Sequence, residues 1–318
     1  MVCLVLTNLF TRISKAMKKF LIKVVLFIAF LAVIDRLAGF AFSYFSENAK
    51  GGYTEHYHYL VDKTKEDVLV FGSSRAIHHY NPRIISDSLG MTCYNCGQDG
   101  NGIVLFYGWW KMITERYHPQ YLIYDITTSY DILIGEDNHK YLGWLKEGYD
   151  RNGIKDIFRS VDKTEPYKMV SQMYRYNSKW HQIVADYIHP IYHFENQGFL
   201  PLDGTMDKMR LDEKKMSRVN AFEYDTLKIT YLKELIKEHG NTKLVFVMSP
   251  SWYGINDDEL RPLYELCKSY NIPFINFGND VKYIQNEKYF IDGLHLNAIG
   301  ADEYTKDLVE SIRELGII

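Results

Sequence analysis

The sequence has few cysteines and an almost balanced charge. It contains four cysteines in 318 residues, and Cys93 and Cys96 form a lone C-x-x-C pair. So few cysteines exclude a scaffold held together by disulfides, and one pair without a second does not supply the ligands of a structural zinc site. A single disulfide between these two cysteines stays open. Lysine and arginine number 37 against 40 acidic residues, a net charge of -3, which excludes the strongly basic surface of a nucleic-acid-binding protein.

The sequence also lacks the spacings that mark common cofactor sites. Gly97, Gly100 and Gly102 do not fit the G-x-G-x-x-G pattern of a dinucleotide site. The chain has no internal repeat and no low-complexity tract. We predict no metal and no cofactor. Four histidines lack acidic or cysteine neighbours at metal-ligand spacing, and we expect them to be solvated or packed: His56, His58, His78 and His79.

One long apolar segment lies near the N-terminus. Residues 1–23 carry basic side chains and no acid, and residues 20–34 are almost wholly apolar. A basic flank before an apolar run predicts a helix that enters a membrane with its N-terminus in the cytoplasm. We therefore predict a single transmembrane anchor within residues 1–45, with Asp35 and Arg36 near the outer interface or paired. No convincing cleavage site follows, which favours an uncleaved anchor over a signal peptide. The rest of the chain is then periplasmic or extracellular.

Beyond a polar and aromatic stretch at residues 46–66, which we interpret as a linker, short apolar runs alternate with helical patterns. Strands that alternate with helices predict a parallel sheet covered on both faces. We expect residues 67–318 to form a three-layer α/β/α domain with a five-stranded, flavodoxin-like parallel sheet. The predicted strands are 68–71, 91–96, 121–126, 243–248 and 273–277, and the helices between and after them are 82–89, 103–116, 227–239, 257–270 and 301–315.

Residues 132–242 contain a long stretch that does not follow this alternation. A helix is expected within residues 167–187, and residues 198–204 are a turn-rich loop. We interpret the region as an insertion beside the carboxyl edge of the sheet, where it can form a lid or a substrate wall, rather than as a separate domain.

Two distant motifs carry the chemistry. Asp292 and His295 lie three residues apart just before the last helix. A carboxylate at this spacing can fix the tautomer of an imidazole and stabilise its protonated form. Alone the pattern is also typical of a polar loop that caps a helix. The second motif is Gly72-Ser73-Ser74, directly after the first strand, which places a hydroxyl at the carboxyl edge where open α/β sheets bind ligands.

A third element is the glycine-rich turn after the second strand. Gly100 lies in it, and a backbone N–H without a neighbouring Cβ can approach a reacting oxygen closely. Acyl transfer needs a nucleophile, a base and donors for the developing oxyanion. Ser74, the Asp292–His295 pair and Gly100 are expected at one edge of one sheet and could supply them.

In these motifs the sequence resembles the SGNH/GDSL hydrolases, and in particular their membrane-anchored bacterial members. Residues 68–75 are similar to the first family motif, which implies that Ser74 is the nucleophile and that its N–H is an oxyanion donor. Residues 94–100 resemble the second motif, with Gly100, or failing that Gly97, as a further donor. Asp292 and His295 match the last motif, with His295 as the base. The resemblance covers about residues 67–131 and 243–318.

The sequence departs from the family pattern at two places. Ser73 stands where the family usually has Asp, and no Asn follows the third strand. Losing one oxyanion donor typically costs on the order of 100- to 1000-fold in rate. Either the oxyanion hole has two donors, or another side chain takes the place of the Asn, the candidates being Thr128, Ser129 and Asn101.

These observations favour a serine esterase that acts on acyl esters, above all O-acetyl esters, of glycans outside the cytoplasm. One alternative is an O-acyltransferase that modifies cell-envelope glycans with a membrane partner. The other is a non-catalytic glycan-binding protein on the same fold. Arg75, next to the nucleophile, either contacts an anionic substrate or pairs with an acid such as Asp125 or Asp131.

Overall fold

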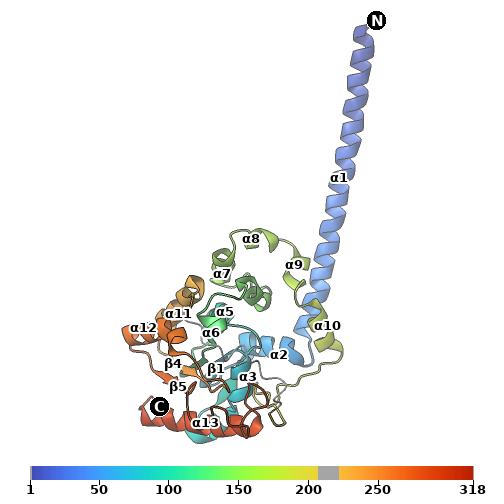
Figure 1. Ribbon diagram of the computed structural model, residues 1–318. Helices are drawn as coiled ribbons and strands as arrows, with labels where there is room; N and C mark the ends of the chain where they lie inside the picture. Colours follow the sequence, from blue (N-terminus) through green and yellow to red (C-terminus); the bar gives the residue numbers. More distant parts are fainter. Residues whose placement is uncertain (1, 207–221, 318) are drawn as a thin grey trace.

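A five-stranded sheet forms the core of the globular part (Figure 1). The computed structural model describes the backbone of residues 2–206 and 222–317, and the side chains from residue 15 onward within these ranges. Neighbouring strands are parallel and follow the order β2-β1-β3-β4-β5, as in flavodoxin-like folds. The predicted α/β class and parallel sheet are confirmed. The strands are β1 (Val68–Gly72), β2 (Cys93–Asn95), β3 (Tyr121–Asp125), β4 (Lys243–Met248) and β5 (Phe274–Asn276).

Helices cover both faces of the sheet, because alternate residues of each strand point to opposite faces. Leu69 and Phe71 belong to the core that α5, α11 and α12 complete. Val68 and Val70 belong to the core that α4 and α13 complete. Three layers result. The helices around the sheet are α3 (Ser74–His79), α4 (Pro82–Leu89), α5 (Ile103–Thr114), α11 (Thr226–Glu238), α12 (Arg261–Tyr270), which follows η5 (Asp257–Leu260), and α13 (Ala298–Glu314).

The stretch at residues 46–66 differs from the predicted linker. It forms helix α2 (Gly52–His58) and a π-helical turn η1 (Tyr59–Lys63). Its aromatic and aliphatic side chains, such as Tyr57 and Leu60, are buried in the α5-side core. Arg116 donates to three carbonyls in and after η1. The aromatic content that made the stretch look irregular is thus what attaches it to the domain.

The insertion also packs on the domain core. The helix expected within residues 167–187 is divided into several short helices, and residues 207–221 of the insertion lie outside the described residues. Tyr141, Leu145 and Ile157 join the same core as α5. Helix α6 (Thr128–Asp131) precedes the insertion, and the elements of the insertion are η2 (Asn138–Leu145), α7 (Ile154–Val161), α8 (Glu165–Lys168), α9 (Gln172–Tyr176) and α10 (Trp180–Ile188).

Residues 197–204, which we call the strap, contact the end of β2, helix α3 and the start of α13. The strap has no regular structure after Gly198. A Cβ on Gly198, where φ is 86°, would lie 1.9 Å from the carbonyl oxygen of Asn95, so this close approach requires glycine. Leu200 N–H donates to Ile77 O at 3.0 Å, and Leu202 O accepts from Ala298 N–H at 2.8 Å. The strap therefore links α3 to the start of α13.

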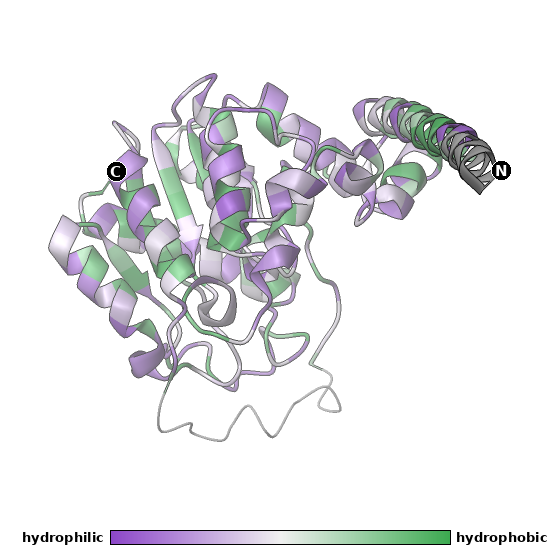
Figure 2. Cartoon of the chain, turned by 90° about the horizontal axis from the view of Figure 1, so that it is seen from above, coloured by the Kyte–Doolittle hydropathy of each residue, from purple (hydrophilic) through white to green (hydrophobic). Residues whose placement is uncertain are grey.

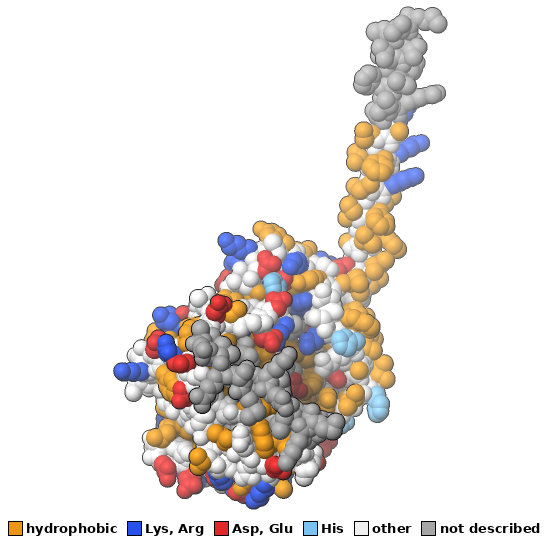
Figure 3. All heavy atoms as spheres, in the orientation of Figure 1, with side chains coloured by type: hydrophobic (Ala, Val, Ile, Leu, Met, Phe, Trp, Pro, Cys, Tyr) orange, Lys and Arg blue, Asp and Glu red, His pale blue; other side chains and the backbone are white. Residues whose placement is uncertain are grey.

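A long helix, α1 (Val2–Glu47), projects from the globular part (Figures 1 and 2). Large apolar side chains are exposed along it between residues 17 and 40 (Figure 3). Among the helices that the structure describes, none combines the length and apolarity needed to cross a membrane. The predicted transmembrane anchor is therefore not confirmed.

The C-terminal part of α1 is attached to the insertion by the carboxylate of Asp35. Asp35 accepts hydrogen bonds from the Ser171 hydroxyl at 2.5 Å and from the backbone N–H groups of Gln172 and Met173, both at 2.9 Å. It thus caps α9, whose first N–H groups have no partner within the helix. Arg36 lies 4.0 Å from Asp35 and donates to Val170 O at 3.1 Å. Asp35 and Arg36 are therefore paired, which is one of the two arrangements that we predicted for them from the sequence.

Candidate active site

The structure brings Ser74, His295 and Asp292 into one hydrogen-bonded chain. Ser74 Oγ lies 2.9 Å from His295 Nε2. His295 Nδ1 lies 3.1 and 3.0 Å from the two carboxylate oxygens of Asp292. All three distances are within hydrogen-bond reach, as is required between a nucleophile and its base and between a base and the group that orients it. The three predicted side chains therefore have the geometry of an activated serine.

Asp292 is held as an ionised carboxylate. Burial would raise its pKa, but the His295 ring and the backbone N–H groups of Leu294 and His295 donate to the carboxylate and lower the pKa to about 2. The carboxylate therefore stays charged at neutral pH. In this state it keeps the Nδ1 proton on His295, which leaves Nε2 free to accept the Ser74 proton.

A glycine before the serine allows the turn that presents it. Gly72 has φ of 143°, and a Cβ there would lie 2.8 Å from both the Asp125 carbonyl oxygen and the Ala76 side chain. The chain therefore passes closely over the end of β3 before α3 begins at Ser74. Ser73 has a buried hydroxyl with no partner in the described part of the chain.

His79 is a second histidine at the site, and sequence reasoning did not assign it a role. Its Nε2 accepts from Leu296 N–H at 3.0 Å, next to His295, and its Nδ1 lies 3.2 Å from Ser249 Oγ. An accepting Nε2 means that Nδ1 carries the proton of a neutral ring. Burial lowers the pKa of His79 well below its ordinary value, and His295 and Arg75 act in the same direction. His79 thus anchors the Asp292–His295 loop to α3.

Arg75 points into the ends of the strands rather than to the surface. Its Nε lies 3.6 Å from Asp125 Oδ2, and its terminal nitrogens donate to Ser249 O at 3.2 Å and to Ile126 O. Both side chains are buried. Burial raises the pKa of Asp125, and the Arg75 guanidinium opposes this rise. The pairing expected with Asp125 is present, and it fixes the ends of β3 and β4 beside Arg75.

The other residues predicted as oxyanion donors differ in their surroundings and in the hydrogen bonds that they already make. Gly100 has φ of 64° and no close neighbour at its Cβ position. It does not line the cleft described below, so its role as a donor stays a prediction. Gly97 N–H already donates to Asn95 Oδ1 at 2.9 Å. Asn101 donates to Asp99 O at 2.7 Å, and the Thr128 hydroxyl donates to Glu259 at 2.6 Å.

An open cleft of about 1120 Å³ begins at Ser74. A second hollow, of about 640 Å³ and lined mainly by α11 and α12, contains none of the three site residues. The wall of the cleft comes mainly from the loops after β1, β3 and β4, with Asn279 after β5 and Leu294 before α13, and combines rings, hydroxyls, amides and carboxylates. Its polar members include Thr127, Thr128, Ser129, Tyr130, Glu136, Ser251, Tyr253, Asn256, Asp257, Asp258, Glu259 and Asn279.

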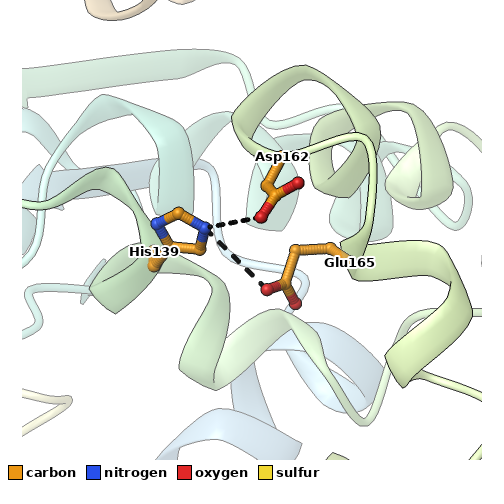
Figure 4. A group of neighbouring side chains, drawn as sticks. All are labelled: His139, Asp162 and Glu165. Carbon is orange, nitrogen blue, oxygen red and sulfur yellow. Dashed lines mark hydrogen bonds and ion pairs between the residues drawn. The ribbon is translucent and has the colours of Figure 1, made fainter.

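One cluster of metal-ligand type lies on the insertion, away from this chemistry. His139, Asp162 and Glu165 approach one another (Figure 4), with His139 Nε2 3.4 Å from Asp162 and 3.9 Å from Glu165. Lys168 already neutralises them, 2.7 Å from Glu165 and 3.8 Å from Asp162. A hydrogen bond to Asp137 raises the pKa of His139, which favours the protonated ring. We therefore interpret the cluster as an ion-pair network.

Cys93 and Cys96 are free buried thiols. Burial raises the pKa of both well above the ordinary value, so neither has the thiolate character of a nucleophile.

Comparisons with known proteins find solved structures that are similar at low sequence identity. No protein-family model matches the chain, and no curated protein matches it. Among solved structures, a putative platelet activating factor from Streptococcus pneumonia is 11% identical with a TM-score of 0.40, over 81% of this chain and 90% of that one. A family two carbohydrate esterase from Clostridium thermocellum is 11% identical with a TM-score of 0.40, over 80% and 66% of the two chains. The acetyl xylan esterase Est2A from Butyrivibrio proteoclasticus is 9% identical with a TM-score of 0.36, over 79% and 64%.

The buried neutral histidines predict a loss of stability in acid. Burial lowers the pKa of His79 well below its ordinary value and that of His56 to about 3. Below a pH of about 6.5 the unfolded chain therefore binds protons that the folded chain does not. Stability should fall with falling pH, by at most about 1.4 kcal/mol per pH unit for each histidine. Urea unfolding of the full chain at pH 7.5 and 5 measures this, and His79→Gln should reduce the difference between the two midpoints.

The matched control is His181→Gln, because His181 is exposed. It should keep the wild-type dependence on pH. An undiminished dependence in His79→Gln would show that His79 is not the neutral anchor described here.

Proposed function

We propose that the chain is a serine esterase of the SGNH type that cleaves O-acyl esters. The observation that carries the proposal is the contact of 2.9 Å between Ser74 Oγ and His295 Nε2, on a ring whose Nδ1 faces Asp292. A serine hydroxyl is a weak nucleophile until an adjacent base can take its proton. This arrangement provides that base at the carboxyl edge of a parallel sheet.

The reaction follows from the positions of the three side chains. Ser74 Oγ attacks the ester carbonyl carbon while its proton passes to His295 Nε2, and the carbonyl electron pair moves to oxygen. When the tetrahedral intermediate collapses, His295 gives the proton to the leaving alkoxide and an acyl-serine remains. Water then attacks the acyl group, and its proton passes through His295 back to Ser74 Oγ as the carboxylic acid leaves. Asp292 stabilises the imidazolium in both halves.

We propose small acyl groups, above all acetyl, on a glycan as the substrate. The breadth of the cleft supports this, since about 1120 Å³ exceeds the need of an acetyl ester alone. Tyr130 and Tyr253 supply rings, and Asn256 and Asp257 supply amide and carboxylate groups along the wall. Such a surface suits a hydroxyl-rich alcohol. Transfer of the same acyl group to a sugar hydroxyl instead of water would make the chain an acyltransferase, and product analysis separates the two.

The main test is turnover of an ester by the full chain and its Ser74→Ala variant. Wild type should hydrolyse 4-nitrophenyl acetate and release acetate from an O-acetylated oligosaccharide. Ser74→Ala should lose activity by a factor on the order of 10⁶, to the background rate. Ser178→Ala, an exposed serine on the insertion, is the control and should match wild type. Glycan binding without turnover by the folded wild type would instead indicate a binding protein.

We also propose that α1 attaches the chain to a membrane and that the domain lies outside the cytoplasm. The row of exposed apolar side chains between residues 17 and 40 supports attachment, because a contiguous apolar surface marks an interaction site. The basic residues before it support an N-terminus in the cytoplasm. In fractionated cells the full chain should sediment with membranes, resist an alkaline carbonate wash and dissolve in detergent. Recovery of the full chain in the wash supernatant would contradict the attachment.

A further inference from the structure

One hydroxyl in the wall of the cleft that contains Ser74 has no partner in the described part of the chain. Thr127 follows β3 and lines the cleft together with Ser74. Its Oγ1 is buried and makes no hydrogen bond within the described part of the chain. Buried polar groups in native proteins are almost always paired, so an unpaired one in the wall of this cleft requires an explanation.

Ser73, the residue before Ser74, also has a buried hydroxyl without a partner in the described part of the chain, but it does not line the cleft. The other side chains considered as donors are engaged or exposed. The Thr128 hydroxyl donates to Glu259 at 2.6 Å, and the Asn101 amide donates to Asp99 O at 2.7 Å. The Ser251 hydroxyl donates to Gly254 O at 3.1 Å. Ser129 is exposed to solvent, where water competes for its hydroxyl. Thr127 is thus the hydroxyl of this set that can donate to a new acceptor without first breaking a bond.

A buried carboxylate fixes Thr127 in place. Asp131 Oδ2 accepts from Thr127 N–H at 2.7 Å. Its Oδ1 accepts from Ile103 N–H at 2.7 Å and from the Tyr124 hydroxyl at 2.8 Å. Ile103 is the first residue of α5 and directly follows the glycine-rich turn. One carboxylate therefore joins the loop after β2 to the loop after β3, which are the two loops expected to form the oxyanion hole.

A buried lysine supports the same loop from the other side. Lys228 of α11 donates to Ser129 O at 2.9 Å and to Leu133 O at 2.7 Å. Burial raises the pKa of Asp131 to about 7 in spite of its three donors. The folded chain thus keeps a carboxylate where burial disfavours its charge, and perturbed buried acids of this kind gather at functional sites.

We propose, on the basis of the esterase function above, that Thr127 is an oxyanion donor in place of the missing Asn, and that Asp131 is its positioning residue. As Ser74 Oγ bonds to the ester carbon, the carbonyl electron pair moves to the oxygen. The Thr127 hydroxyl donates a hydrogen bond to this oxyanion and keeps its proton. When the carbonyl re-forms, the bond weakens again, so Thr127 acts on the transition state more than on the bound ester.

Steady-state hydrolysis of 4-nitrophenyl acetate by the full chain tests the donor. Thr127→Val keeps the shape and removes the hydroxyl, and it should lower kcat by about 100- to 1000-fold with little change in KM. Thr127→Ser restores the hydroxyl and should recover most of the rate. Thr230→Val, at an exposed threonine of α11, is the matched control and should match wild type. A wild-type rate in Thr127→Val, or a loss in Thr128→Val alone, would overturn the assignment.

A double-mutant cycle tests the role of Asp131. Asp131→Asn places an amide against Thr127 N–H and should also lower kcat. If Asp131 acts through Thr127, the double variant should lose no more than Thr127→Val alone, because the two effects are coupled. Additive losses would mean that Asp131 only supports the fold. If Asp131→Asn does not fold, the comparison of Thr127→Val with Thr127→Ser still tests whether Thr127 is the oxyanion donor.

The outcomes separate this inference from the proposed function. Wild-type turnover that Ser74→Ala abolishes and Thr127→Val leaves intact would contradict the inference alone. A folded wild type without turnover would remove the reaction, and with it the role of Thr127.

Discussion

The hydrogen bond between Ser74 and His295 joins residues 221 positions apart in the chain. It forms because α3 begins directly after β1, an interior strand of the sheet, while the loop before α13 crosses the same edge. His79 and the strap hold the two sides together: His79 binds the backbone beside His295, and Leu200 and Leu202 of the strap bind α3 and α13 respectively. The insertion is therefore part of the scaffold of the site, besides forming one wall of its cleft.

The fold was predictable from the sequence where local patterns and long-range contacts agree. The strands β1 to β4 are short runs that are buried except at Lys243, as parallel strands require, while β5 is partly exposed. All five strands are found within two residues of the predicted bounds at either end. The Asp292–His295 spacing could be recognised for a similar reason. A three-residue turn lets Asp292 bind both the backbone and the ring of His295, so this geometry is local.

Other features depend on contacts between distant residues and could not be predicted in this way. Within residues 46–66 the buried Tyr53, Tyr57, Leu60 and Val61 recur at helical spacing, but the polar residues between them favoured the interpretation as a linker. The roles of His79 and Asp131 depend on partners 217 and 28 residues away. Thr127 stands out because its neighbour Thr128 is engaged by Glu259, 131 residues away. In each case the chemistry is set by which hydrogen bonds the fold completes and which it leaves open.

The central claim is that Ser74 is an activated nucleophile, and a covalent probe tests it without knowledge of the substrate. The folded wild-type chain should be treated with a fluorophosphonate, and the modified peptide identified by mass spectrometry. We predict one adduct, on Ser74, that forms in the wild type and not in His295→Ala. No adduct on a folded wild-type chain, or an adduct on another serine, would contradict it.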